Sequence, residues 1–155
     1  MLQRAGARAG EAVLLYYGPN GTDLLDATGL EMIEAVRAIG ARTVVATTTD
    51  AQREFVQSLG FEDAVAGVVS LGDHFDWPAT MPRLADAKKD IETFRSGVRD
   101  FQDRTLKPFG AAVGALLRSP DNPRGAPDLI LERAGHDALG VSTSLVKPFT
   151  GRVVY

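Results

Sequence analysis

The sequence contains no cysteine, few aromatic residues and no long apolar run. The missing cysteine excludes disulfides, thiolate catalysis and cysteine-ligated zinc. The apolar run near the N-terminus, AVLLYY, is far shorter than the ~20 residues that cross a membrane. A net charge of only -3 gives no electrostatic reason to expect nucleic acid or an anionic membrane as partner. We therefore expect a cytoplasmic protein that binds neither.

The residues that are present suffice for one globular domain. The chain has 155 residues, of which 45% are hydrophobic and 24% are charged. These values are typical of a soluble domain with a real core. No internal repeat or linker divides the sequence, so we treat residues 1–155 as a single unit.

Apolar runs alternate with helical patterns in the first half of the chain. Residues 11–17, 42–50 and 64–71 have the composition of strands, and residues 30–40 and 51–60 between them have apolar residues at helical spacing. The order strand, helix, strand, helix, strand with short connections predicts a parallel sheet with right-handed crossovers.

The second half interrupts this alternation before completing it. Residues 72–118 read as a helical insertion, and we expect two helices in it that meet near Pro108, which cannot donate a helical hydrogen bond. A fourth strand, a short helix and a fifth strand follow, in residues 129–132, 136–146 and 151–155.

The stretch PDLILERAGHDALGVSTSLVKPFTGRVVY resembles the second half of the cofactor domain in the medium-chain dehydrogenase/reductase superfamily. The shared pattern is an acid, an apolar triplet, a second acid, a glycine, a short helix, and then proline and glycine before another strand. The residues at these places are Asp128, Glu132, Gly135, Leu145, Pro148 and Gly151. Residues 40–65 resemble the second strand, the ribose-end loop and the following helix of that family, and residues 2–17 are similar to its first strand.

Within the superfamily, the chain most resembles enoyl-thioester reductases of the crotonyl-CoA carboxylase/reductase type, including the reductase module of propionyl-CoA synthases. The resemblance implies a three-layer α/β Rossmann-like sheet of order 3-2-1-4-5, with the helical insertion 72–118 before strand 4. It also implies a parent enzyme that uses NADPH to reduce the β-carbon of an enoyl-CoA thioester. This chain would supply cofactor binding and no catalytic residue.

Two further expectations follow. The chain lacks the family's flanking catalytic domain, so we expect it to be a fragment without turnover of its own. The fifth strand would offer an open edge through which two copies could pair. Two alternatives stay open: a degenerate scaffold with little cofactor affinity, suggested by the missing GxGxxG, or the cofactor domain of another medium-chain enzyme such as a quinone reductase.

The residues at the end of the second strand predict whether the chain binds NADP(H) or NAD(H). NAD-selective Rossmann domains place an acid there, whereas this chain has Thr48 and Thr49, followed by Arg53. Neutral hydroxyls and a guanidinium suit the 2′-phosphate of NADP(H). Gln52 replaces the family's usual lysine. In the bland alternative, the threonines end a strand, Asp50 caps the next helix and Arg53 is solvated.

The stretch YYGPNGTDLLDATG connects the first strand to the first helix. We expect Gly18, Asn20, Gly21 and Thr22 to line the cofactor site here, and Gly29 to lie close against the sheet. The helix could begin at Gly29, with Thr28 and Glu31 forming a capping box, or after Asp23 as N-cap. On either reading the carboxylates of Asp23 and Asp26 lie near the mouth of the site, and we expect a weak pyrophosphate cradle.

By resemblance, the loop after the fourth strand passes the nicotinamide ribose, which predicts cofactor contacts from Glu132 and Ala134. For Arg133 we expect a solvated strand end, and for Ser142 a filler position in a helix. The two histidines do not form a catalytic or metal-binding pattern, although His74 lies near Asp73 and Asp76. We assign no catalytic residue and no metal.

Overall fold

The computed structural model describes residues 6–18, 24–61, 65–74 and 84–155. Its centre is a five-stranded sheet of order β3-β2-β1-β4-β5, in which every neighbouring pair is parallel. The strands are β1 (Ala12–Tyr17), β2 (Arg42–Thr47), β3 (Val65–Ser70), β4 (Leu129–Leu131) and β5 (Arg152–Val154). The predicted three-layer architecture and strand order are confirmed.

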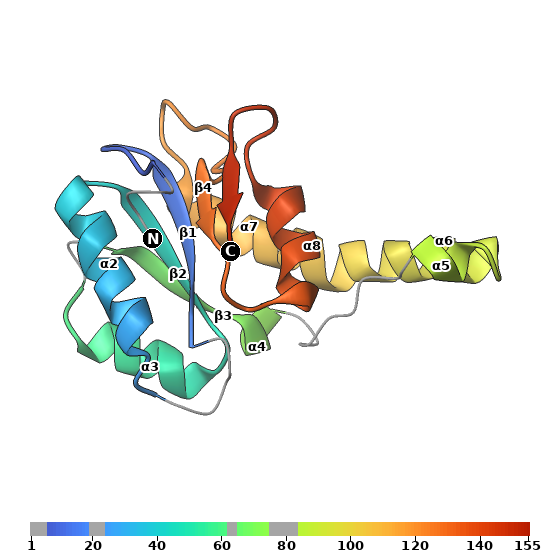
Figure 1. Cartoon of the computed structure of the whole chain (residues 1–155), viewed down its shortest axis with the longest axis horizontal. Helices are drawn as coiled ribbons and strands as arrows, with labels where there is room; N and C mark the ends of the chain where they lie inside the picture. Colours follow the sequence, from blue (N-terminus) through green and yellow to red (C-terminus); the bar gives the residue numbers. More distant parts are fainter. Residues whose placement is uncertain (1–5, 19–23, 62–64, 75–83) are drawn as a thin grey trace.

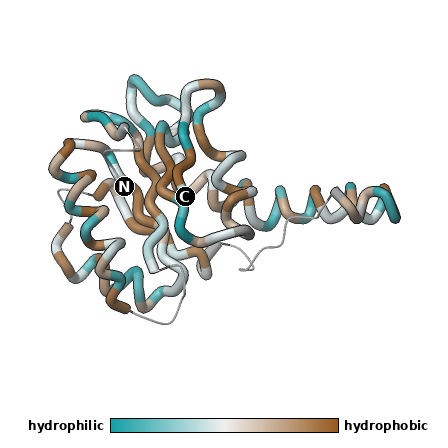
Figure 2. The backbone as a smooth tube through the Cα atoms, viewed as in Figure 1, coloured by the Kyte–Doolittle hydropathy of each residue, from teal (hydrophilic) through white to brown (hydrophobic). Residues whose placement is uncertain are grey.

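The central strand β1 is buried on both faces, and none of its residues is more than 4% exposed. Leu14 and Tyr16 point into one apolar cluster, while Leu15 and Tyr17 point into the other, because successive side chains of a strand face opposite sides. Apolar residues accordingly fill the middle of the molecule (Figure 2). A sheet that is apolar on both faces needs helices on both.

Helices cover both faces as this burial requires (Figure 1). The helices α2 (Ala27–Ile39) and α3 (Asp50–Ser58) contribute Ile33, Val36 and Val56 to one cluster. The helices α7 (Lys107–Leu117) and α8 (His136–Leu145) contribute Phe109 and Val141 to the other. The core therefore consists of two apolar layers that share one sheet.

The segment between β3 and β4 is helical, as expected. It contains α4 (Leu71–His74), α5 (Leu84–Ala87), α6 (Ile91–Phe101), a π-helical turn η1 (Gln102–Leu106) and α7. The two helices expected to meet near Pro108 are α6 and α7, since α7 begins at Lys107; they are joined by η1 without a break. In η1 the N–H of Lys107 donates to the carbonyl of Gln102, five residues back. This π-type shift lets the helix continue where Pro108 lacks an N–H.

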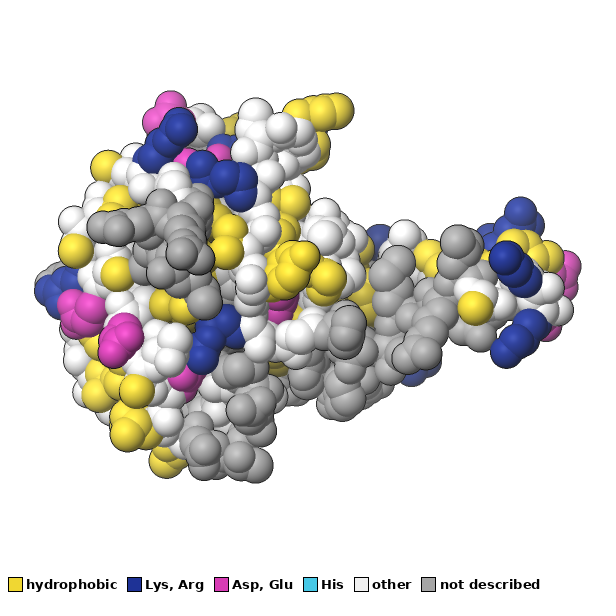
Figure 3. All heavy atoms as spheres, viewed as in Figure 1, with side chains coloured by type: hydrophobic (Ala, Val, Ile, Leu, Met, Phe, Trp, Pro, Cys, Tyr) yellow, Lys and Arg dark blue, Asp and Glu magenta, His cyan; other side chains and the backbone are white. Residues whose placement is uncertain are grey.

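The outer part of this helical rod extends away from the sheet, with α5 beside α6 (Figure 1). Basic and acidic side chains lie together at its outer end (Figure 3), as on a solvated helix face. Within the described ranges, every helix is too short or too polar to cross a membrane. Pairing of chains through β5 stays a prediction.

Candidate functional site

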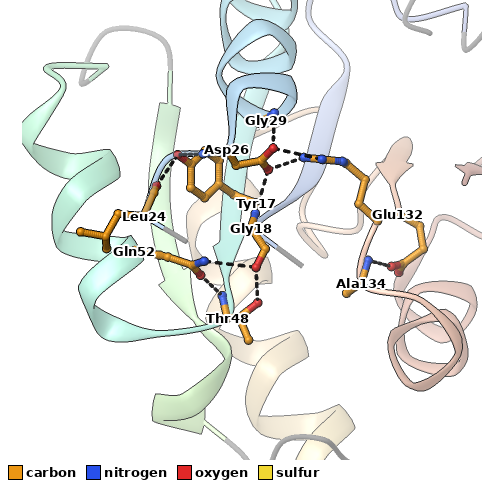
Figure 4. Close-up of polar contacts among 10 residues, drawn as sticks. Tyr17, Gly18, Leu24, Asp26, Gly29, Thr48, Gln52, Glu132 and Ala134 are labelled. Carbon is orange, nitrogen blue, oxygen red and sulfur yellow. Dashed lines mark hydrogen bonds and ion pairs between the residues drawn. The ribbon is translucent and has the colours of Figure 1, made fainter. Parts of the chain in front are cut away.

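The carboxyl ends of β1, β2 and β4 meet at one edge of the sheet, where Tyr17 lies opposite Thr47 and Leu15 opposite Leu131. The strand order runs outward from β1 through β2 on one side and through β4 on the other. In open parallel sheets, ligands bind at this edge, beside the strands where the order reverses, which here are β1 and β4. Described residues that follow these two strands approach one another there (Figure 4).

Gly18 ends β1 in a left-handed conformation, with φ +60°, and is buried. Its N–H donates to Asp26 Oδ2 at 2.9 Å. Its carbonyl accepts hydrogen bonds from Thr48 Oγ1 at 2.9 Å and from Gln52 Nε2 at 3.2 Å. A Cβ atom at this position would lie 2.2 Å from Gln52 Nε2. Backbone conformation and space therefore both require glycine here.

Asp26 is the N-cap of α2, and it accepts a hydrogen bond from the N–H of Gly29 at 3.0 Å. Tyr17 fixes the cap, since its hydroxyl accepts from the N–H of Asp26 at 3.0 Å and donates to the carbonyl of Leu24 at 2.8 Å. Both predicted helix starts, at Gly29 and after Asp23, are therefore wrong. The expected position of Gly29 is confirmed, because a Cβ atom there would lie 2.5 Å from the Tyr17 ring on β1.

Arg133 reaches from the loop after β4 to the N-terminus of α2 and pairs with Asp26. Its Nη1 donates to Oδ2 of Asp26, and its Nη2 donates to Oδ1 at 3.1 Å. The two side chains are only 18% and 12% exposed. The expectation that Arg133 merely solvates a strand end is wrong, because residues 107 positions apart in sequence form a bidentate, part-buried ion pair.

The surroundings of Asp26 favour its ionised form. Burial alone would raise the pKa of Asp26, but the hydrogen bonds from Arg133, Gly18 and Gly29 outweigh burial and hold that pKa below its usual value. The pair is thus a carboxylate and a guanidinium at neutral pH. One negative charge therefore sits at the N-terminus of α2, where the helix dipole would otherwise attract a ligand anion.

Thr48 and Thr49 follow β2, and Arg53 lies in the first turn of α3. Thr49 caps α3, and its side chain accepts from the N–H of Gln52 at 3.3 Å. The alternative without a coenzyme is wrong only about the cap, which is Thr49 and not Asp50; a threonine does end β2. Arg53 is partly exposed and lies 3.8 Å from Asp50 Oδ1. The proposed contacts of these residues with a coenzyme stay predictions.

The sequence did not predict that Gln52 connects the ends of β1 and β2. Its side chain is buried, and Oε1 accepts from the N–H groups of Thr48 at 3.0 Å and Thr49 at 3.3 Å while Nε2 reaches Gly18. One amide thus joins the ends of β1 and β2. The spacing Thr49-x-x-Gln52 is a capping-box pattern, and this local signal could have revealed part of its role.

Glu132 lies under the loop after β4, and it is 4% exposed. Its Oε1 accepts from the N–H of Ala134 at 2.6 Å, and its Oε2 lies 2.5 Å from Ser142 Oγ. Ser142 Oγ is also 3.2 Å from the hydroxyl of Tyr16, so the expectation that Ser142 only fills a helix position is wrong. Burial raises the pKa of Glu132 despite these hydrogen bonds, and burial likewise raises the pKa of Tyr16.

Glu132 and Ala134 therefore bond to one another and shape the loop that presents Arg133. Direct contact of either with a coenzyme stays a prediction. The other predicted cofactor residues, Asn20, Gly21 and Thr22, lie outside the described residues, as does Asp23. In the described part of the chain, no group of three or more acids or histidines could hold a metal ion.

The residues present suit a dinucleotide better at the end of β2 than at the N-terminus of α2. At the end of β2, two threonines and a guanidinium stand where a ribose-binding acid would exclude a 2′-phosphate. At the N-terminus of α2, the Asp26 carboxylate would repel a pyrophosphate, whereas the guanidinium of Arg133, paired with it, would attract one.

No family model and no curated protein sequence matches the chain. Solved structures do match. The crotonyl-CoA carboxylase/reductase AntE in complex with NADP is 24% identical over 95% of this chain, with a TM-score of 0.61. A putative enoyl reductase domain of a polyketide synthase is 19% identical over 98% of it, with a TM-score of 0.56. These matches belong to the medium-chain dehydrogenase/reductase superfamily. The fold of this chain is theirs.

The predicted resemblance to this superfamily is thus confirmed as a likeness of fold. A third match, the quinone oxidoreductase from Thermus thermophilus, also solved as a complex with NADPH, is 21% identical over 99% of the chain, with a TM-score of 0.53. The chain spans 30% of the length of AntE, 59% of the polyketide synthase domain and 34% of the quinone oxidoreductase.

Proposed function

We propose that this chain is the NADP(H)-binding domain of a medium-chain reductase. The observation that carries the proposal is the pairing of a 3-2-1-4-5 parallel sheet with a hydroxyl-rich end of β2 that has a guanidinium one helical turn away. Two matching structures, AntE and the Thermus quinone oxidoreductase, were solved with NADP or NADPH, which supports the same coenzyme here.

The residues at the ends of β2 and β4 have different roles in the proposed site. Gln52 holds the ends of β1 and β2 together, next to Thr48 and Thr49. Glu132 holds the loop after β4 through the N–H of Ala134. Arg53 would contact the 2′-phosphate, since its planar guanidinium matches phosphate geometry. The bound coenzyme would supply the hydride.

For the parent enzyme, we propose reduction of an enoyl thioester, with the hydride delivered to the β-carbon. The support is the sequence resemblance to crotonyl-CoA carboxylase/reductases, together with the match to AntE and to a putative enoyl reductase domain. A quinone reductase parent is the competing proposal, supported by the Thermus match. The substrate-contacting and proton-donating groups would come from outside the cofactor domain.

Titration with NADPH and NADH, followed by coenzyme fluorescence, tests the proposed coenzyme. The chain should bind NADPH more tightly than NADH, and Arg53→Ala should weaken NADPH binding while leaving NADH binding nearly unchanged. Arg37→Ala is a matched control, since Arg37 forms a comparable pair with Glu34 one turn away on α2. If Arg53→Ala weakens both coenzymes equally, its proposed role is wrong.

A scaffold with little coenzyme affinity is the second candidate. It is favoured by the internal use of the polar groups at this edge: the N–H and carbonyl of Gly18, the N–H of Gly29 and the guanidinium of Arg133 all have partners within the chain. The same titration separates the two candidates, because a scaffold would bind neither coenzyme.

A further inference from the structure

A side-chain pair joins two connections at the centre of the carboxyl edge. Asp26 belongs to the connection that follows β1, and Arg133 belongs to the connection that follows β4. Figure 4 shows the Asp26 carboxylate pointing toward the loop after β4, with the pair's contacts spanning the space between the two connections. A dinucleotide in a sheet of this kind passes through that space.

The bridging pair presents a ligand with two opposite charges. The Asp26 carboxylate opposes an anion at the N-terminus of α2, whereas the Arg133 guanidinium would attract it. While the two charges are paired, they largely cancel. A pyrophosphate is itself an anion with several oxygens, so it can accept the same two hydrogen bonds that Arg133 now donates to Asp26.

We propose that Asp26 holds the guanidinium of Arg133 in the free chain, and that the pyrophosphate of a dinucleotide displaces Asp26 from it. This inference rests on the proposed coenzyme function and adds a phosphate ligand, Arg133, and an internal competitor for it, Asp26. Coenzyme binding is then an exchange of one anion for another on a single guanidinium.

The loop after β4 is built to keep its backbone in place during this exchange. The carboxylate of Glu132 holds the N–H of Ala134 directly beyond Arg133, and Ser142 holds that carboxylate from α8. The long arginine side chain can therefore change partners by rotating about its own bonds. Asp26 would retain three contacts without Arg133, because the N–H groups of Gly18 and Gly29 and its own backbone contact with Tyr17 remain.

The variant Asp26→Asn tests the exchange. Asparagine is as good an N-cap as aspartate and can still accept from Gly29, but it does not hold the guanidinium as a carboxylate does. If the open form of the wild-type chain is populated to roughly one part in ten, removing the competitor should tighten NADPH binding by about tenfold. Arg133→Met should weaken NADPH binding, because it removes the proposed phosphate ligand.

A control variant and a titration with a second anion test whether any change in NADPH binding comes from the Asp26–Arg133 pair. Asp100→Asn removes an acid paired with Arg104 on the projecting rod, and it should leave binding unchanged. Each variant is also titrated with inorganic pyrophosphate, and in the wild type and the Asp26 variants the Arg133 guanidinium resonances are followed by NMR. If Asp26→Asn does not fold, Asp26→Ser retains a capping oxygen without charge.

The outcomes separate this inference from the proposed function. Equal NADPH affinity in wild type and Asp26→Asn would overturn the exchange and leave the coenzyme function standing. Tighter pyrophosphate binding by Asp26→Asn, dependent on Arg133, with no NADPH binding by any variant, would support the exchange and overturn the coenzyme function. If no variant binds either anion, both are wrong.

Discussion

The buried amide of Gln52 is the part of the site whose removal has the most direct consequence for stability. We predict that Gln52→Met, which fills a similar volume without polar atoms, lowers the free energy of unfolding by about 2–3 kcal/mol. The contacts of the Gln52 side chain include hydrogen bonds from the N–H groups of Thr48 and Thr49 and one to the carbonyl of Gly18.

The magnitude follows from which partners are left unsatisfied. The carbonyl of Gly18 keeps the hydroxyl of Thr48, so its loss is small. The N–H groups of Thr48 and Thr49 lose the acceptor that holds them, and a net contribution of about 1 kcal/mol for each lost hydrogen bond gives the predicted range. The N–H of Gln52 still donates to Thr49 Oγ1, so the first turn of α3 keeps its cap.

Urea unfolding followed by circular dichroism measures this change, with Gln57→Met on the exposed side of the same helix as the control. The control should stay within about 0.5 kcal/mol of the wild type. For a chain of this size, the Gln52 variant should melt several degrees lower, about 4–12 °C. A loss below about 0.5 kcal/mol in Gln52→Met, on the scale of an ordinary surface change, would refute the idea that this amide joins β1 to β2.

Two further predictions concern stability. Burial raises the pKa of Glu132 above its unfolded value of 4.5, so the folded state binds this proton more tightly than the unfolded state does. The bound proton therefore stabilises the folded state fully below pH 4.5, and this stabilisation is lost as pH rises through the folded pKa. Glu132→Gln should therefore gain stability relative to wild type between pH 5 and pH 8 in urea unfolding, and an unchanged difference would contradict this. Phe149 is fully exposed with φ +69°, so Phe149→Gly should stabilise the chain by about 1 kcal/mol in the same assay; a loss would mean that the ring makes a needed contact.

The layers of the fold could be predicted from the sequence because they depend on patterns within single elements. Runs such as AVLLYY identify strands buried on both faces, and the alternation of strands with helices restricts the sheet to parallel arrangements. The π turn before Pro108 could not be predicted in this way. A proline shows where a helical hydrogen bond is missing, but whether the helix then breaks or shifts its bonding depends on what packs against it.

The site was harder to predict because its contacts join distant residues. Asp26 and Arg133 are 107 positions apart, and no local pattern links them. The start of α2 shows the same difficulty, since Asp23, Asp26 and Thr28 are all acceptable N-caps by composition. Tyr17 favours Asp26 through its hydroxyl, which is a contact made only after the strand and the helix have packed.

The neighbouring hydroxyls of Tyr16 and Tyr17 have a consequence for the alignment of β1. A strand that is apolar on both faces can slide by one residue without exposing apolar surface, so hydrophobic pattern alone fixes its alignment only weakly. The two hydroxyls remove this freedom, because Tyr16 meets Ser142 in the layer of α8 and Tyr17 meets the cap of α2 in the opposite layer. A slip of one residue would turn each tyrosine toward the wrong layer and leave a buried hydroxyl without its partner. The hydroxyls of Tyr16 and Tyr17 thus fix the register of the central strand β1.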